Sequence, residues 1–211
     1  MEIGTANLTG EIYLVTGGAR SGKSAFAETL AAALAAERGG SVAYIATADN
    51  SDDEMDARIR EHRGRRPADW KTIEAPVGLV EAIGKLRAAA APQGAALVDC
   101  VTVWISNLLL TPETSGREPW GMPDAEEAVL RKAEALVRSL KEAPFPVVLV
   151  TNEVGHSLVP EYALGRLFRD VAGKVNQLLA ANAVEVFYVV CGVPLHLRQL
   201  AWRPKGESGE A

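Results

Sequence analysis

The most constraining feature of this 211-residue sequence is a glycine-rich loop between an apolar run and an Ala-rich stretch of helical period. Residues 12–16 read Ile-Tyr-Leu-Val-Thr, and residues 17–24 continue with Gly-Gly-Ala-Arg-Ser-Gly-Lys-Ser. This is the Gly-x-x-x-x-Gly-Lys-Ser pattern of a phosphate-binding loop, in the strand-loop-helix context that it requires. The glycines let backbone N–H groups point inward at phosphates, and the helix N-terminus adds the positive end of its dipole. The pattern predicts that Lys23 reaches the β- and γ-phosphates, that Ser24 ligates Mg²⁺ and that Arg20 adds a cation at the mouth.

The rest of the chain alternates short apolar runs with longer Ala/Leu/Glu/Arg stretches, which is typical of βαβ units around a mostly parallel sheet. We expect strands at 12–16, 41–46, 95–98, 147–151 and 184–190, and helices at 24–38, 52–63, 77–90, 125–141 and 162–181. A further apolar segment, 104–110, is expected to form a helix that serves either an interface or the core. Residues 111–123 predict a loop, and residues 1–10 and 204–211 predict frayed tails. The predicted fold is one α/β domain over residues 1–211, of the P-loop NTPase (RecA-like) type, with helices on both faces of the sheet.

Composition excludes several classes of protein. The net charge of −5 and the pI near 5.3 argue against a protein that mainly coats nucleic acid or an anionic membrane. No window approaches the roughly 18 uninterrupted apolar residues of a membrane span, and the first residues lack an apolar signal region. Cys100 and Cys191 lie far apart without metal-ligand spacing, so we expect reduced core residues. These features favour a cytoplasmic protein.

Two further segments favour a nucleotide site. Asp99 ends the apolar run 95–98, where its carboxylate could hold Mg²⁺ directly or through water; taken alone, such an aspartate is as often a helix cap. Five arginines and one histidine gather in a short segment: Arg58, Arg60, His62, Arg63, Arg65 and Arg66. This local basic cluster suits a triphosphate or a phosphorylated substrate.

Several motifs in order carry a resemblance to a known family. They are Gly17–Ser24, Tyr44-Ile-Ala-Thr47, Asp53-Glu-Met55 with Arg58-Ile59 and His62, Arg66-Pro67, Trp70, Thr151-Asn-Glu-Val-Gly155 with Val159-Pro-Glu161, and Phe168-Arg-Asp-Val-Ala-Gly-Lys-Val-Asn-Gln177. Together they resemble the bifunctional adenosylcobinamide kinase/adenosylcobinamide-phosphate guanylyltransferases of cobalamin biosynthesis. The similarity extends from about residue 12 to residue 193.

The resemblance implies a two-step enzyme. ATP or GTP phosphorylates the aminopropanol hydroxyl of adenosylcobinamide, and GTP then donates GMP to that phosphate, giving adenosylcobinamide-GDP. In this family GMP passes through a histidine, and the matching residue is His62. A neutral imidazole is a suitable nucleophile at phosphorus. His156 is the rival nucleophile, because it follows Asn-Glu-Val-Gly in a loop after a strand; His196 has no expected role.

The same resemblance implies the remaining site residues and the assembly. Lys23 is the second catalytic residue beside His62. The nucleotide-binding set is Gly17, Gly18, Ala19, Arg20, Ser21, Gly22, Lys23, Ser24, Ile45, Ala46, Thr47, Arg63, Gly64, Arg65, Arg66, Glu74 and Asp99, and the metal set is Ser24 and Asp99. Glu74 could accept from ribose hydroxyls or a guanine edge, or could be a solvated strand-end residue. Family members are homotrimers, so a homo-oligomer is expected, with corrinoid and nucleotides as partners and no nucleic acid.

Other readings remain open. A different small-molecule P-loop kinase would transfer a phosphoryl group without a covalent GMP adduct. A nucleotide-controlled binding module would hydrolyse slowly and would not depend on a corrinoid. A RecA-type nucleic-acid motor conflicts with the acidic charge and with the absence of a basic stripe.

Overall fold

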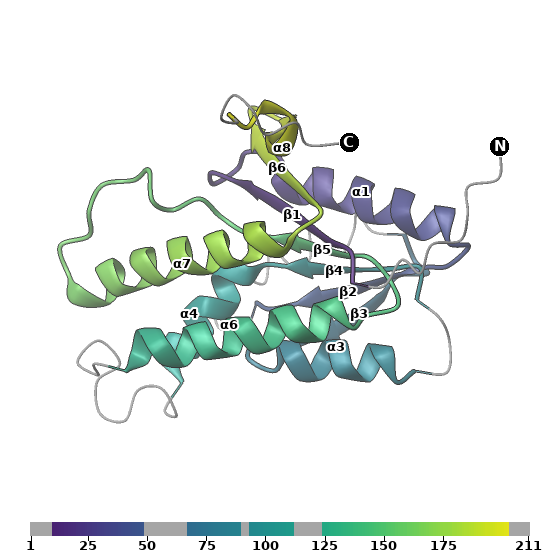
Figure 1. Cartoon of the computed structure of the whole chain (residues 1–211), viewed down its shortest axis with the longest axis horizontal. Helices are drawn as coiled ribbons and strands as arrows, with labels where there is room; N and C mark the ends of the chain where they lie inside the picture. Colours follow the sequence, from purple (N-terminus) through teal and green to yellow (C-terminus); the bar gives the residue numbers. More distant parts are fainter. Residues whose placement is uncertain (1–9, 49–66, 90–92, 112–123, 203–211) are drawn as a thin grey trace.

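The computed structural model describes residues 10–48, 67–89, 93–111 and 124–202 (Figure 1). The predicted helix 52–63 and the predicted tails, apart from Gly10, lie outside these residues. The strands are β1 (Ile12–Gly17), β2 (Val42–Ala46), β3 (Lys71–Glu74), β4 (Ala95–Asp99), β5 (Val147–Val150), β6 (Glu185–Val190) and β7 (Val193–His196). The helices are α1 (Lys23–Glu37), α3 (Leu79–Arg87), α4 (Val101–Leu110), α6 (Ala125–Lys141), α7 (Ala163–Asn182) and α8 (Leu197–Leu200).

The strands form one seven-stranded sheet in the order β3-β2-β4-β5-β1-β6-β7. All neighbours are parallel except β6 and β7. The central strands β1, β2, β4 and β5 are almost continuously apolar and buried, as strands covered on both faces must be. This confirms the predicted α/β class with a mostly parallel sheet.

Helices cover both faces of the sheet (Figure 1). On one face, the alanines of α1 (Ala27, Ala31 and Ala35) pack against Val15, Leu97, Val150 and their neighbours, and small side chains let this helix lie close to the strands. On the other face, α3, α4, α6 and α7 cover a larger core. Trp104, Ile105, Leu108 and Leu109 of α4 belong to that core, whereas Leu110 is exposed. Most of the apolar segment 104–110 is therefore core.

Two strands were not predicted from the sequence. Strand β3 carries Lys71, Thr72 and Glu74, which are exposed, so the segment shows no apolar run. Strand β7 contains Pro194, which is tolerated because β7 is the last strand of the sheet. It pairs with β6 through a tight turn in which Cys191 and Gly192 have φ of 51° and 79°. Both values fit the left-handed turns that favour hairpins.

That turn corrects the expectation for the cysteines. Both are free, but Cys100 is buried and Cys191 is exposed in the turn, not in the core. The apolar run before Cys191 misled the sequence interpretation, because the chain reverses just as the run ends.

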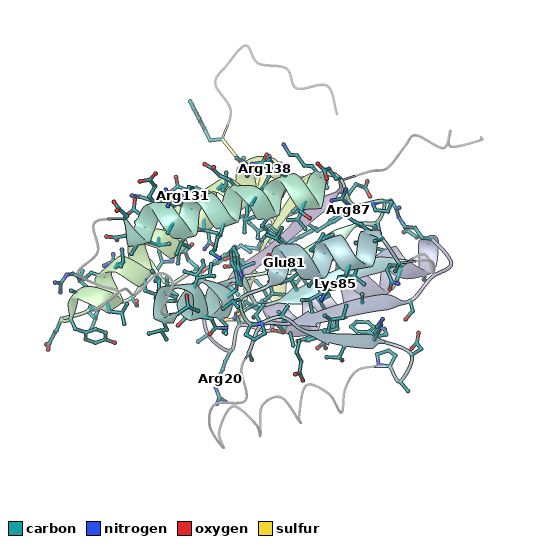
Figure 2. All side chains as sticks on the ribbon, turned by 90° about the horizontal axis from the view of Figure 1, so that it is seen from below. Arg20, Glu81, Lys85, Arg87, Arg131 and Arg138 are labelled. Atoms are coloured by element: carbon teal, nitrogen blue, oxygen red, sulfur yellow. The ribbon has the colours of Figure 1, made fainter. Side chains whose placement is uncertain are left out.

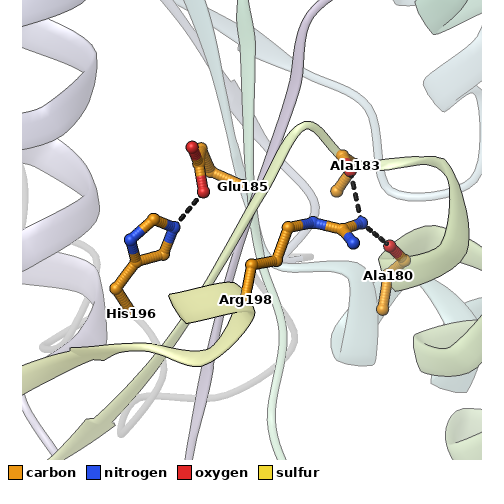
Figure 3. Close-up of polar contacts among 5 residues, drawn as sticks. All are labelled: Ala180, Ala183, Glu185, His196 and Arg198. Carbon is orange, nitrogen blue, oxygen red and sulfur yellow. Dashed lines mark hydrogen bonds and ion pairs between the residues drawn. The ribbon is translucent and has the colours of Figure 1, made fainter. Parts of the chain in front are cut away.

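Side-chain contacts hold β7 against β6 and α8 against the end of α7 (Figure 3). His196 contacts the Glu185 carboxylate, and its ring stacks on Phe187 at 5.1 Å between centroids. Arg198 of α8 donates hydrogen bonds to Ala180 O at 2.7 Å and Ala183 O at 2.6 Å, at the end of α7. His196, which had no expected role, thus joins β7 to β6 within the hairpin. Among the described residues, no helix is long and apolar enough to cross a membrane.

Candidate nucleotide site

The carboxyl ends of the parallel strands meet at one edge of the sheet, and the predicted site residues gather there. The P-loop follows β1, Ile45 and Ala46 end β2, Glu74 ends β3 and Asp99 ends β4. In the register of the sheet, Ala46 pairs with both Glu74 and Asp99, so these residues lie at one level. Ligands of open α/β sheets bind outside this edge. The parallel topology therefore brings residues that are far apart in the sequence to the same edge of the sheet.

The P-loop backbone takes a shape that its glycines alone allow. A Cβ atom at Gly17 would lie 2.5 Å from Val189 O and 2.7 Å from Ser21 Oγ, which is too close for any side chain. Gly22 has φ of 94° and caps α1, whose first turn contains no acidic residue. The N-terminus of α1 is thus open to an anion, in accord with the predicted role of the loop.

Lys23 is the first residue of α1, at the end of the P-loop that follows β1. Its residue is 9% exposed, and Nζ donates to Gly18 O of the loop at 3.1 Å. Burial lowers the pKa of Lys23, while the neighbouring Cys100 and Asp99 act in the opposite direction. A buried ammonium group in a glycine-rich loop would gain most from a phosphate, which would replace the water that burial removed.

Asp99 and Ser24 provide oxygen atoms suited to Mg²⁺. The Asp99 carboxylate accepts a hydrogen bond from Tyr44 OH at 3.1 Å, which orients it at the end of β4. Ser24 lies in the first turn of α1 and is half-buried. Among the described residues, no three His, Cys, Asp or Glu side chains cluster as a metal cage. Mg²⁺ is commonly held by one or two protein oxygens together with substrate phosphates, so this donor set fits a nucleotide-bound Mg²⁺.

The residues at the end of β2 are mostly buried and support the edge of the sheet from below. Thr47 is fully buried, and its Oγ1 donates to Cys100 O at 2.7 Å while it accepts from Cys100 N at 2.8 Å. Asn107 Nδ2 donates to Thr47 O at 2.8 Å. Ile45 is also fully buried, whereas Ala46 is half-buried. Ile45 and Thr47 therefore shape the floor of the edge, and Thr47 holds the chain after Asp99.

Glu74 and Arg20 mark the two ends of the candidate site. Glu74 is exposed on β3, four strands from β1, or roughly 19 Å at about 4.8 Å per strand. Arg20 is exposed, has φ of 55°, and points away from the side of the molecule that carries Arg131 and Arg138 (Figure 2). The site is thus an extended edge, long enough for a nucleotide lying along it.

The remaining predicted residues fall outside this geometry. His62, Arg63, Gly64, Arg65 and Arg66 lie outside the described residues, so their roles stay predictions. His156 is exposed in the loop after β5. His196 lies in the C-terminal hairpin, in contact with Glu185.

A buried polar network next to the P-loop was not found from the sequence. Thr102 Oγ1 lies 3.1 Å from Thr151 Oγ1 and accepts from Asn152 N at 2.6 Å. Thr151 Oγ1 donates to Asn176 Oδ1 at 2.7 Å, and Asn176 Nδ2 donates to Asn152 O at 3.1 Å. The available signal was Asn176, a polar residue beside Val175 in the buried stripe of α7. The network joins α4, the residues that follow β5, and α7.

Comparison with known proteins bears on what this edge does. Residues 13–197 match the family model described as cobinamide kinase / cobinamide phosphate guanyltransferase. The chain belongs to this family. It is 44% identical, over 89% of its length and 99% of the relative, to the "Bifunctional adenosylcobalamin biosynthesis protein CobU" of Escherichia coli. The Salmonella typhimurium protein of the same name is also 44% identical, over 89% of this chain and 99% of the relative. The Pseudomonas aeruginosa "Bifunctional adenosylcobalamin biosynthesis protein CobP" is 42% identical, over 88% and 96%.

The cobinamide kinase / cobinamide phosphate guanyltransferase match contains the whole described sheet edge. It begins within β1, before the P-loop, and ends after His196. The predicted resemblance is therefore confirmed at the level of the family, over the same part of the chain that forms the sheet and its helices.

Proposed function

We propose that this chain catalyses two successive transfers at the P-loop edge of its sheet. In the first, the aminopropanol hydroxyl of adenosylcobinamide attacks the γ-phosphorus of ATP or GTP and the nucleoside diphosphate leaves. In the second, GMP from GTP is transferred to the new phosphate, and pyrophosphate leaves. The family match over residues 13–197, on a chain whose Lys23 and Asp99 share the P-loop edge, carries this proposal.

The placement of residues along the edge suggests how a nucleotide is held. We assign the polyphosphate to the P-loop, with Lys23 and the N-terminus of α1 around it. The base and ribose would extend across β5 and β4 toward Ala46 and Glu74. Ser24 and Asp99 would hold Mg²⁺, which when bound would offset phosphate charge.

We further propose that His62 carries GMP between the two substrates. Its Nε2 or Nδ1 would attack the α-phosphorus of GTP, the bond to the β-phosphate oxygen would break, and pyrophosphate would depart. The corrinoid phosphate would then displace the histidine. Arg63, Arg65 and Arg66 would offset the phosphate charge in this step.

The acceptor is assigned to the chain that leads away from β5. Leu158, Val159 and Tyr162 are exposed there, with Leu158 at 93%. A large, partly apolar corrinoid would cover such side chains more readily than a polar substrate would. We also propose that one domain hosts both steps, that the protein is cytoplasmic and that it assembles as a homo-oligomer, a trimer by family resemblance.

The test of the proposed function is incubation of the purified protein with adenosylcobinamide, GTP and Mg²⁺, followed by mass spectrometry. We expect a phosphorylated corrinoid and then a GDP-linked corrinoid. A phosphorylated product without the GDP-linked one would favour a small-molecule kinase that lacks the second step. Absence of both products would contradict the proposal.

The nucleophile is tested with GTP labelled at the α-phosphorus. We expect a covalent, acid-labile adduct that His62→Ala abolishes. His156→Ala is the matched control and should keep the adduct. An adduct that survives in His62→Ala and disappears in His156→Ala would reassign the nucleophile to His156.

A further inference from the structure

Strand β5 has a special position in the sheet. It lies directly between β1, which leads into the P-loop, and β4, which ends at Asp99. Val150 at its end pairs with both Val15 and Asp99. The residues that follow Val150 must therefore lie between the loop that binds phosphate and the carboxylate suited to metal. Neither the P-loop pattern nor the predicted metal pair includes any of them.

Alternation along this strand decides which residue faces the site. Val148 and Val150 belong to the core on the α1 side, and Thr151 reaches the opposite side, where it bonds Asn176 of α7. Asn152 should then point back to the α1 side, the side on which Lys23 opens α1. It does so: Asn152 Nδ2 donates to Cys100 Sγ, a member of the α1-side core, at 4.0 Å.

The backbone of Asn152 is fixed by two hydrogen bonds. Thr102 Oγ1 accepts from its N–H at 2.6 Å, and Asn176 Nδ2 donates to its carbonyl at 3.1 Å. The next residue is also fixed, because Glu153 N donates to Gly17 O of the P-loop at 3.1 Å. Thr102 and Thr151 are buried, so water does not compete for this network. Asn152 is thus placed relative to the P-loop with little freedom.

The side chain of Asn152, in contrast, has hydrogen-bonding capacity to spare. Within the described parts of the chain, Cys100 Sγ is its one partner, and sulfur is a weak acceptor. A rigidly placed amide with a weak partner, at the same sheet edge as the buried Lys23, is arranged for a stronger acceptor than sulfur.

We propose that Asn152 Nδ2 donates a hydrogen bond to a γ-phosphate oxygen of the nucleoside triphosphate in the P-loop, and that Thr102 and Asn176 are positioning residues for it. This rests on the proposed function, since it requires a triphosphate in the loop. In the kinase step the acceptor hydroxyl oxygen bonds to the γ-phosphorus, the bond from that phosphorus to the bridging oxygen breaks, and the diphosphate leaves with the electron pair. The hydroxyl proton is released to solvent. Asn152 would stabilise the charge on the non-bridging γ-oxygens during this transfer.

The test compares a triphosphate with a diphosphate, because the γ-phosphate alone distinguishes them. Titration calorimetry with Mg²⁺ would measure α,β-methylene-GTP and α,β-methylene-GDP, whose bridging carbon prevents transfer of GMP. Asn152→Ala should lower the affinity for the triphosphate by about tenfold to a hundredfold, as expected for loss of a hydrogen bond to a charged group. The affinity for the diphosphate should stay within about twofold of the wild-type value. Asn152→Asp keeps the size of the side chain but places a carboxylate beside the phosphate, so it should lower the affinity for the triphosphate further.

Asn182→Ala is the matched control, since Asn182 lies on α7 and bonds Leu178 O of its own helix. It should change neither affinity. The ratio of the affinity for the triphosphate to the affinity for the diphosphate should fall in Asn176→Ala, but by less than in Asn152→Ala. A general loss of stability would not change this ratio of affinities. Equal weakening of both ligands in the Asn152 variants, or no weakening, would overturn the proposal. If the wild-type protein binds neither ligand, the proposed function fails first, and the role of Asn152 falls with it.

Discussion

The P-loop is flanked by two regions that support it in different ways. On the β5 side, it lies next to a network in which the side chains of Thr102, Thr151 and Asn176 and the backbone of Asn152 are hydrogen-bonded. On the β6 side, it lies against the tight turn of the C-terminal hairpin, where Gly192 N donates to Ser21 O at 2.8 Å. A Cβ atom at Gly22 would come within 3.1 Å of Gly192 Cα, so the two backbones touch.

The two sides of the P-loop differ in whether side chains or backbone atoms lie next to the loop. The β5 side places polar side chains next to the P-loop, and the amide of Asn152 donates there only to Cys100 Sγ among the described residues. The β6 side contacts the loop through backbone, while its polar side chain His196 joins β7 to β6 and Arg198 joins α8 to the end of α7. We therefore expect changes on the β5 side to alter catalysis and changes in the hairpin to alter stability.

The largest expected effect lies at Lys23, where both flanks meet. Lys23→Met keeps the length of the side chain and removes its charge, so phosphoryl transfer should fall by about 100- to 1,000-fold, as for loss of one charge-stabilising donor. Without nucleotide the variant should be at least as stable as the wild type, because it removes a buried charge. Single-turnover kinetics and thermal unfolding would measure both. A clear loss of stability would show that Lys23 holds the apo loop together.

The pH dependence of that stability difference follows from the lowered pKa of Lys23. Its folded pKa is below its ordinary value of 10.5, so between the two values the unfolded chain binds more protons than the folded one. The free energy of unfolding of the wild type should then rise with pH, relative to Lys23→Met, across this alkaline window. Denaturant unfolding at a series of pH values up to 10.5 would detect it; an opposite slope would contradict a pKa lowered by burial.

An intermediate effect is expected for Thr102 in the β5-side network. Thr102→Val keeps the shape but leaves Asn152 N–H without its acceptor, which should cost about 1–3 kcal/mol of unfolding free energy and lower the kinase rate. Thr102→Ser keeps the hydroxyl and should lose far less. Denaturant unfolding and the kinase assay would be made on both variants. A loss in Thr102→Ser with none in Thr102→Val would mean that the methyl group, not the hydroxyl, matters.

The smallest effect is expected in the hairpin. Arg198→Ala removes two hydrogen bonds to carbonyls at the end of α7, but water can replace them at this exposed position, so about 0.5–1 kcal/mol should be lost. Transfer rates should stay unchanged. Gln199→Ala, on the same exposed helix, is the control. A fall in rate as large as in Thr102→Val would remove the distinction between the two flanks.

Much of the fold followed from local patterns. The strand that leads into the P-loop, the Ala-rich α1 and helix α6 were predicted because their apolar residues repeat with clear periods. Strand β3 was missed because its side chains are mostly exposed at the sheet edge, and β7 because its partner is set by a hairpin turn. Edge strands gain their stability from pairing, and pairing leaves no periodic apolar signal.

The candidate site divides in the same way. The sequence by itself determined the phosphate loop, because glycines, a lysine and a serine at fixed spacing can be recognised without knowledge of their neighbours. It also indicated Asp99, at the end of an apolar run. The place of Asn152 between them was decided by the tertiary structure alone, since β5 inserts between β1 and β4 although it follows both in the chain. Strand order arises from how helices and strands pack together, and that packing turned a residue of the Asn-Glu-Val-Gly segment into a neighbour of the P-loop.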